Sequence, residues 1–224
     1  CYAKRLGNQS RFILPTPYTE LTTPQVLAMT WVEGEPIESL ANASQGLRDE
    51  VAKALFDLAL KELFEFGVLQ SDPNFANYRF NHDEQKIVLL DFGATREIPQ
   101  SMVEGYLELM RTGIEKNSTK MREAASDIGY FSQDMTQQQI DAVMELFMMA
   151  CEPLCHSGPY DFAGSNLPRR MHDAGMALAL DRDYWHTPPI DALFVHRKLA
   201  GMYLLAARLK ARVDIGSVAK KYFN

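Results

Sequence analysis

The strongest constraint on the fold of this chain is a polar block in residues 70–93. The block begins with Gln-Ser-Asp-Pro-Asn-Phe-Ala-Asn and ends with Asp-Phe-Gly. Asp72 and Asn77 lie five positions apart, and Asp91 follows fourteen positions later. A fold that accommodates this block has to hold two carboxylates and one amide on loops that flank a short hairpin.

The residues around the block predict the elements that support it. Apolar residues spaced along one helical face predict an amphipathic helix over residues 46–66. Gly67 follows this helix, at a position where a left-handed C-cap favours glycine. Residues 78–80 and 86–90 are β-prone and flank the turn-forming residues 81–84, which predicts the hairpin.

The rest of the chain divides into a small β part and a large helical part. Residues 11–14 and 26–32 are β-prone and are separated by proline-rich stretches, which predicts two strands. No repeat, low-complexity tract or flexible linker interrupts the sequence. Helical patterns after Gly93 cover residues 100–116, 118–128, 137–149, 167–179 and 190–211. These elements predict an α+β fold.

Composition narrows the class of protein. The chain has 224 residues, of which 46% are hydrophobic and 23% charged, as in ordinary globular proteins. The net charge of −6 argues against nucleic acid as a partner. No apolar run reaches the roughly 18 to 20 residues of a membrane span.

Three cysteines predict no disulfide framework and favour a reducing compartment. Because the chain opens on Cys1 rather than Met, we expect it to be a fragment.

The spacing of Asp72, Asn77 and Asp91 is typical of kinase-like folds, which arrange a catalytic Asp, a metal-binding Asn and a metal-binding Asp around nucleotide phosphates. Magnesium prefers hard oxygen ligands, such as the Asp91 carboxylate and the Asn77 amide oxygen. In this scheme Asp72 orients the attacking hydroxyl or water, or accepts its proton. The alternative is that all three are turn residues, because Asp, Asn and Gly favour turns.

Two segments, residues 63–77 and 87–96, resemble the ABC1/UbiB family of atypical kinase-like proteins, a family linked to ubiquinone biosynthesis. Residues 26–34 and 196–201 resemble it more weakly. The polar block is similar to the branch with the mitochondrial members and their bacterial relatives, where Gln-Ser/Thr-Asp-Pro-Asn replaces His-Ala-Asp.

The resemblance implies a protein-kinase-like α+β fold with ATP and Mg²⁺ as cofactors. Residues 1–36 would be the remnant of the N-lobe, with its last strands and the hinge. Residues 37–224 would be the mostly helical C-lobe, with the catalytic loop and the Asp-Phe-Gly hairpin.

Individual roles follow from the same resemblance. Asp72 is implied as the catalytic-loop Asp, with Asn77 and Asp91 as magnesium ligands. Residues of the nucleotide site would be Met29, Thr30 and Val32, in the gatekeeper and hinge, and Phe92 and Gly93. The backbone of Thr30 and Val32 would meet the adenine edge.

Two departures from ordinary protein kinases shape the expected activity. The chain contains no glycine-rich phosphate loop, and the strand Lys and its helix Glu partner would lie upstream of Cys1. After Gly93 only residues 94–99 precede the next predicted helix, and no Ala-Pro-Glu element follows. We therefore expect an atypical ATPase or kinase that supports ubiquinone biosynthesis or lipid and quinone homeostasis, although this fragment alone would be inactive. The alternatives are a nucleotide-gated scaffold (pseudokinase) and a small-molecule phosphotransferase.

The resemblance also implies partners and a location. The implied partners are ATP, a phospholipid membrane surface and quinone-biosynthesis enzymes. The expected location is membrane-associated in the bacterial cytoplasm, with the matrix face of the mitochondrial inner membrane as the alternative.

Several other features are expected to be structural. Residues 151–156 read Cys-Glu-Pro-Leu-Cys-His, but three residues separate the cysteines where covalent haem takes two, so core or loop cysteines are favoured. A methionine-rich helix face in residues 144–149 is expected to fill the core, with interface or lipid contact as the alternative. The histidines at 172, 186 and 196 are assigned no chemistry. The basic pairs at 169–170 and 220–221 are expected on the solvated surface, with phospholipid contact as the alternative.

Overall fold

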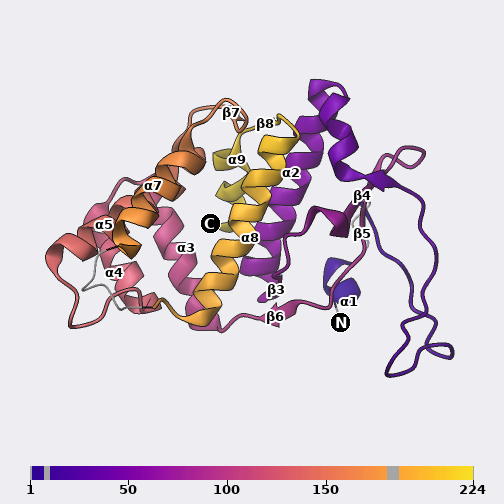
Figure 1. The fold of residues 1–224 in the computed structure, drawn as a ribbon, viewed down its shortest axis with the longest axis horizontal. Helices are drawn as coiled ribbons and strands as arrows, with labels where there is room; N and C mark the ends of the chain where they lie inside the picture. The colour runs from indigo at the N-terminus through magenta and orange to yellow at the C-terminus, as the bar shows by residue number, and fades with distance from the viewer. Residues whose placement is uncertain (1, 8–10, 181–186, 224) are drawn as a thin grey trace.

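The computed structural model describes residues 2–7, 11–180 and 187–223. A four-stranded sheet lies to one side of the molecule, and the long helices pack together on the other (Figure 1). The predicted α+β class is confirmed. Among the described helices, none is both long enough and apolar enough to cross a bilayer.

Helix α2 (Gln45–Lys61) confirms the predicted helix before the polar block. Its N-terminus is capped by the Ser44 side chain, which accepts a hydrogen bond from the Leu47 amide. Its last turn continues as the π-helix η2 (Glu62–Phe66), and Gly67 then adopts a left-handed conformation with φ 59°. Because glycine reaches this conformation at little cost, the helix ends here and the chain turns into the site.

The hairpin is also confirmed. Strands β4 (Tyr78–Asn81) and β5 (Lys86–Leu89) pair antiparallel, with Tyr78 opposite Leu89. Strand β1 (Phe12–Ile13) lies parallel to β5, and β2 (Glu35–Pro36) lies antiparallel to β4. The β-prone residues 11–14 thus supply an edge strand of this sheet.

The predicted strand over residues 26–32 is wrong. Residues 14–34 form a long excursion between β1 and β2, in which two isolated bridges, Pro17 with Met29 and Thr23 with Val26, take the place of a strand (Figure 1). Strand propensity mainly reports how well a side chain fits a half-buried pleated surface. No described strand runs alongside this segment, and Trp31 is 83% exposed.

The helices predicted after Gly93 are confirmed to within three residues at their ends. Short elements were missed, because two to six residues show too little periodicity. The long helices are α3 (Gln100–Ile114), α4 (Ser118–Ile128), α5 (Gln137–Ala150), α7 (Leu167–Ala179) and α8 (Ile190–Arg208). The missed ones are α1 (Tyr2–Leu6), β2 (Glu35–Pro36), η1 (Ile37–Asn42), β3 (Val68–Gln70), η3 (Phe75–Asn77), β6 (Thr95–Glu97), α6 (Glu152–Cys155), β7 (Tyr160–Asp161), β8 (Arg212–Val213), α9 (Ile215–Ala219) and η4 (Lys220–Tyr222).

Two hydrophobic clusters form the core, and α8 contributes to both. The first joins α1, α2, the hairpin and the C-terminal elements, and contains Met202 and Leu205 of α8. The second joins α3, α4 and α5, and contains Ala192 and Val195 of α8. Helix α8 therefore connects the two halves of the core and passes beside the polar block (Figure 1).

Candidate functional site

The two ends of the polar block are brought together by a small antiparallel ladder. Strand β3 leads into the block and β6 leads out of it, with Gln70 opposite Thr95. The Ser71 amide and hydroxyl both donate to the Ala94 carbonyl, over 3.0 and 2.8 Å. The chain from Asp72 to Gly93 is therefore a closed loop with a fixed base.

Asp72 and Asn77 are in direct contact. The Asn77 Nδ2 donates to Asp72 Oδ2 over 3.0 Å, and Arg197 Nη2 of α8 donates to Asp72 Oδ1 over 3.1 Å. Asn77 is held in place because its carbonyl accepts the Leu90 amide at the end of the hairpin. The side chain of Asn74 caps the intervening turn by accepting the Ala76 amide over 3.1 Å.

Asp91 lies two residues after the end of β5. Its Oδ1 accepts the Gly93 amide over 2.7 Å, and its backbone carbonyl accepts Gln70 Nε2 over 3.2 Å. Asn77 and Asp91 line one small cavity of about 10 Å³. The structure thus brings Asn77 together with both predicted carboxylates.

The donor set fits a hard divalent cation such as Mg²⁺. The Asn77 amide nitrogen is used at Asp72, so its oxygen is directed away from that carboxylate. The Gly93 amide uses one oxygen of the exposed Asp91 carboxylate, which leaves the second oxygen for a ligand. One carboxylate and one amide oxygen are ligands that magnesium accepts while keeping several waters.

Phe92 lines the small cavity with Asn77 and Asp91, and Gly93 forms the turn after Asp91. The Phe92 ring is half-buried and lies 4.5 Å from the Tyr2 ring, centroid to centroid. Gly93 is exposed, and its amide shapes the turn through Asp91. Their predicted contacts with a nucleotide remain predictions.

Met29, Thr30 and Val32 lie on the excursion and are not gathered with the polar block. Among the described residues, no hydrogen bond or ion pair joins them to Asp72, Asn77 or Asp91. The Thr30 amide donates to the Thr16 carbonyl over 2.9 Å, so only its carbonyl is left for an adenine edge.

The end of the excursion is attached to the hairpin. Asn81 Nδ2 donates to the Glu33 carbonyl over 3.2 Å, and Arg79 Nε donates to the Gly34 carbonyl over 2.8 Å. These contacts fix the chain where it returns to the sheet at β2.

A buried ion pair behind the polar block was not foreseen from the sequence. Lys198 Nζ lies 2.9 Å from Glu62 Oε2, and both side chains are at most 2% exposed. Tyr2 donates its hydroxyl proton to the same carboxylate. Lys198 also donates to the Tyr78 hydroxyl over 3.3 Å. Burial lowers the pKa of Lys198, but Glu62 raises it, and the net pKa lies above its ordinary value.

This pair is linked to the polar block through Gln70. The Gln70 amide donates to Glu62 Oε2 over 3.3 Å, and its side chain donates to the Asp91 carbonyl. A sequence signal for the pair exists: Glu62 follows the buried Leu58 by four positions, and Lys198 precedes the buried Met202 by four. A charge on the buried face of an amphipathic helix indicates a partner, because an unpaired buried charge is costly.

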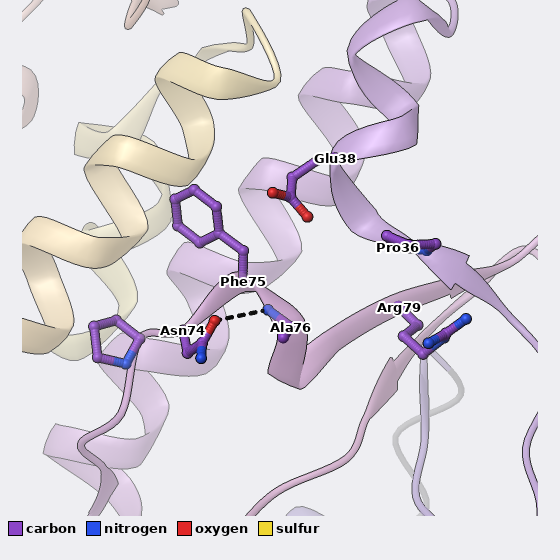
Figure 2. A pocket seen from close by; sticks show the side chains of 7 residues that line it. Pro36, Glu38, Asn74, Phe75, Ala76 and Arg79 are labelled. Carbon is purple, nitrogen blue, oxygen red and sulfur yellow. Dashed lines mark hydrogen bonds between the residues drawn. The ribbon is translucent and has the colours of Figure 1, made fainter.

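An open pocket of about 580 Å³ adjoins the turn that follows Asp72. Figure 2 shows its lining: Pro36 at the end of β2, Glu38 of η1, Asn74 to Ala76 after Asp72, and Arg79 of β4. This volume suits a small-molecule ligand. Glu38 and Arg79 were not singled out from the sequence.

The remaining features are mostly structural. Cys151 is buried, and burial raises the pKa of its thiol to about 12. No group of three or more His, Cys, Asp and Glu residues within the described parts of the chain could hold a metal. On the methionine-rich face Phe147 is buried and Met148 is exposed. His186 lies outside the described residues.

The basic pairs take part in surface ion pairs. Arg169 and Arg170 pair with Asp173 and Glu152, and Lys221 pairs with Asp57.

Comparison with known proteins identifies the family. The profile of the ABC1 atypical kinase-like domain matches residues 2–125. Similar relatives are the mitochondrial atypical kinases COQ8B of Rattus norvegicus (33% identical over 95% of this chain and 40% of the relative) and COQ8 of Saccharomyces cerevisiae (29%, over 97% and 44%). The chain therefore spans about two fifths of the length of these relatives.

A solved structure shows the same fold. It is that of Rv3197 from Mycobacterium tuberculosis in complex with erythromycin, with a TM-score of 0.73 and 18% identity over 99% of this chain and 55% of that one. The kinase-like fold predicted from the sequence is thus confirmed, and the chain belongs to the ABC1 atypical kinase-like family.

Proposed function

We propose that this chain carries the catalytic-loop and metal-binding half of an atypical kinase-like ATPase that binds ATP with Mg²⁺. The observation that carries the proposal is the contact of Asn77 with Asp72, together with the cavity that Asn77 shares with Asp91. Kinase-like phosphoryl transfer requires these three groups around the nucleotide phosphates.

Each residue has a proposed role. Asn77 and Asp91 would hold the magnesium ion, which neutralises charge on the phosphate oxygens when bound. Asp72, held at both carboxylate oxygens, orients the attacking hydroxyl or water and accepts its proton. Phe92 and Gly93 shape the turn that presents Asp91. Met29, the Thr30 carbonyl and Val32 would form the hinge at the adenine.

The segment after Gly93 supports a non-peptide activity. This segment forms strand β6 and reaches helix α3 at Gln100, so no long activation segment lies between the Asp-Phe-Gly turn and α3. An ordinary protein kinase switches its site through such a segment and docks peptides on it. We therefore propose release of phosphate from ATP, or transfer to a small molecule, rather than phosphorylation of proteins.

The relatives bear on the biological setting. Several that match more than 90% of this chain carry the words atypical kinase and mitochondrial in their names. We propose a role in ubiquinone biosynthesis at the matrix face of the mitochondrial inner membrane, in preference to the bacterial cytoplasm. Quinone-biosynthesis enzymes and a phospholipid surface are the proposed partners.

The test is Asp91→Ala in the full-length natural protein. Mg²⁺-dependent ATP binding, measured by calorimetry, should weaken by at least tenfold, while Asp173→Ala, on the exposed face of α7, should bind as the wild type does. Unchanged binding in Asp91→Ala would make the site assignment wrong.

Asp72→Asn separates an enzyme from a scaffold. An enzyme should lose turnover and keep ATP binding, because the metal ligands are untouched. A scaffold should still complement a deletion strain with this substitution. Product analysis then distinguishes free phosphate, from an ATPase, from a phosphorylated small molecule.

A further inference from the structure

Helix α8 contacts the catalytic loop at two positions one turn apart. Arg197 Nη2 donates to Asp72 Oδ1 over 3.1 Å. Four residues later, a Cβ atom on Gly201 would lie 2.1 Å from the Cβ of Pro73. The backbone of α8 therefore lies directly against the loop residue that follows Asp72, and only glycine permits this approach.

The same helix also holds the segment that leaves the polar block. Arg96 of β6 pairs with Asp191 of α8 over 2.6 Å, and its guanidinium lies 4.6 Å from the centre of the Phe194 ring. Both ends of the block thus rest on one helix that is anchored in both core clusters.

We propose that Arg197 is a positioning residue for the reaction: from α8 it fixes the orientation of the Asp72 carboxylate. Asn77 holds one oxygen of this carboxylate and Arg197 holds the other. Two donors on different oxygens fix the rotation of the carboxylate plane, whereas one donor leaves it free to turn. The proposal rests on the proposed function, because Asp72 must act in a reaction for its orientation to matter.

The exposure of Arg197 separates this role from a stabilising one. Its side chain is 59% exposed, and that of Asp72 is 29% exposed. Exposed ion pairs add little to the stability of a fold. By contrast, a misplacement of about 1 Å at a reacting group can cost about 100-fold in rate. The contact should therefore affect turnover much more than folding.

The experiment uses the full-length natural protein and measures phosphate release from Mg-ATP. Arg197→Ala should lower kcat by about 10- to 100-fold and leave the KM for Mg-ATP within about twofold, because Asn77 and Asp91 are unchanged. Arg197→Lys should recover part of kcat, because it keeps the charge without the planar fork. Arg208→Ala, exposed on the last turn of the same helix, is the matched control and should behave as the wild type does.

A double-mutant cycle supplies a second readout. In Asp72→Asn, adding Arg197→Ala should lower kcat no further, because the group that Arg197 orients is already disabled. In urea unfolding, the cycle of Arg197→Ala with Asp72→Ala should show a coupling of roughly two- to fivefold in the unfolding constant, as for exposed ion pairs.

Three results would overturn the positioning role alone. These are an unchanged kcat in Arg197→Ala, a raised KM with kcat preserved (which would make Arg197 a contact of the nucleotide), and an absence of coupling in the unfolding cycle. A wild-type protein that binds Mg-ATP without turning it over would instead overturn the proposed enzymatic function, and the positioning role with it.

Discussion

Lys198 illustrates how a single buried charge supports the site. Its ammonium lies 2.9 Å from Glu62 in a network with Tyr2 and Tyr78. Lys198→Met leaves the buried Glu62 carboxylate without its cation, which should lower the free energy of unfolding by about 3–5 kcal/mol. Urea unfolding of the purified protein measures this loss.

The control for this substitution is Lys221→Met. Lys221 pairs with Asp57, but its side chain is 49% exposed, so the loss should stay below about 1 kcal/mol. Adding Glu62→Gln to Lys198→Met should restore part of the stability, because the unpaired charge is removed. Equal losses in Lys198→Met and Lys221→Met would contradict the buried-pair interpretation.

His196 should make stability depend on pH. It packs against Tyr130 and bonds to its hydroxyl, and burial lowers its pKa from 6.5 to about 4. As pH falls from about 6.5 to about 4, His196 is protonated in the unfolded chain but stays neutral in the folded chain, so stability decreases. The loss should reach at most about 3 kcal/mol.

The measurement is the unfolding free energy between pH 7 and pH 4. His196→Gln should flatten this profile relative to the wild type, whereas His172→Gln, exposed on α7, should leave it unchanged. A slope that persists in His196→Gln would assign the pH dependence to other groups.

At the scale of elements, the contact of α3 with α4 depends on a small residue. A Cβ atom on Gly105 would lie 2.5 Å from Ile128 Cγ1. Gly105→Ala should therefore destabilise the protein by about 1–3 kcal/mol through overpacking. Gly175→Ala is the matched control, since Gly175 lies inside α7 with open space around it and should gain about 0.5–1 kcal/mol. Thermal unfolding of the two variants should shift in opposite directions.

Elements were predictable where local periodicity coincided with tertiary packing. The long helices and the hairpin show this, because their apolar faces recur at a clear period and are buried. Residues 26–32 show the reverse: their strand propensity is high, but no strand in the described part of the chain pairs with them. Strands β3 and β6 are short, and they form by pairing with each other at the base of the polar block. Local sequence does not encode such a long-range pairing.

The geometry of the candidate site, like the secondary structure, was predictable only where its contacts are local in sequence. The gathering of Asp72, Asn77 and Asp91 follows from their fixed spacing around a hairpin, which is local. The contribution of α8 is not local, since Arg197 reaches Asp72 across 125 positions of sequence. Likewise, Lys198 and Glu62 meet only because two distant helices pack together.

For the whole molecule, the exposed excursion of residues 14–34 predicts where proteases cut. Leu21, Leu27 and Trp31 on the excursion are more than 60% exposed, and most of the excursion's backbone lies outside any ladder. Limited chymotrypsin digestion should cleave there first, because proteases act on exposed, extended backbone. The large product should begin at residue 22, 28 or 32 and include residues 37–224. Leu204 is 52% exposed but lies in α8, so its peptide bond should resist cleavage.

In the full-length protein, Mg-ATP should slow cleavage at Leu27 and Trp31 if the adenine contacts Thr30 and Val32. Early cleavage at Leu204 would contradict the prediction that the excursion is cut first. Equal cleavage rates with and without Mg-ATP would contradict the hinge assignment.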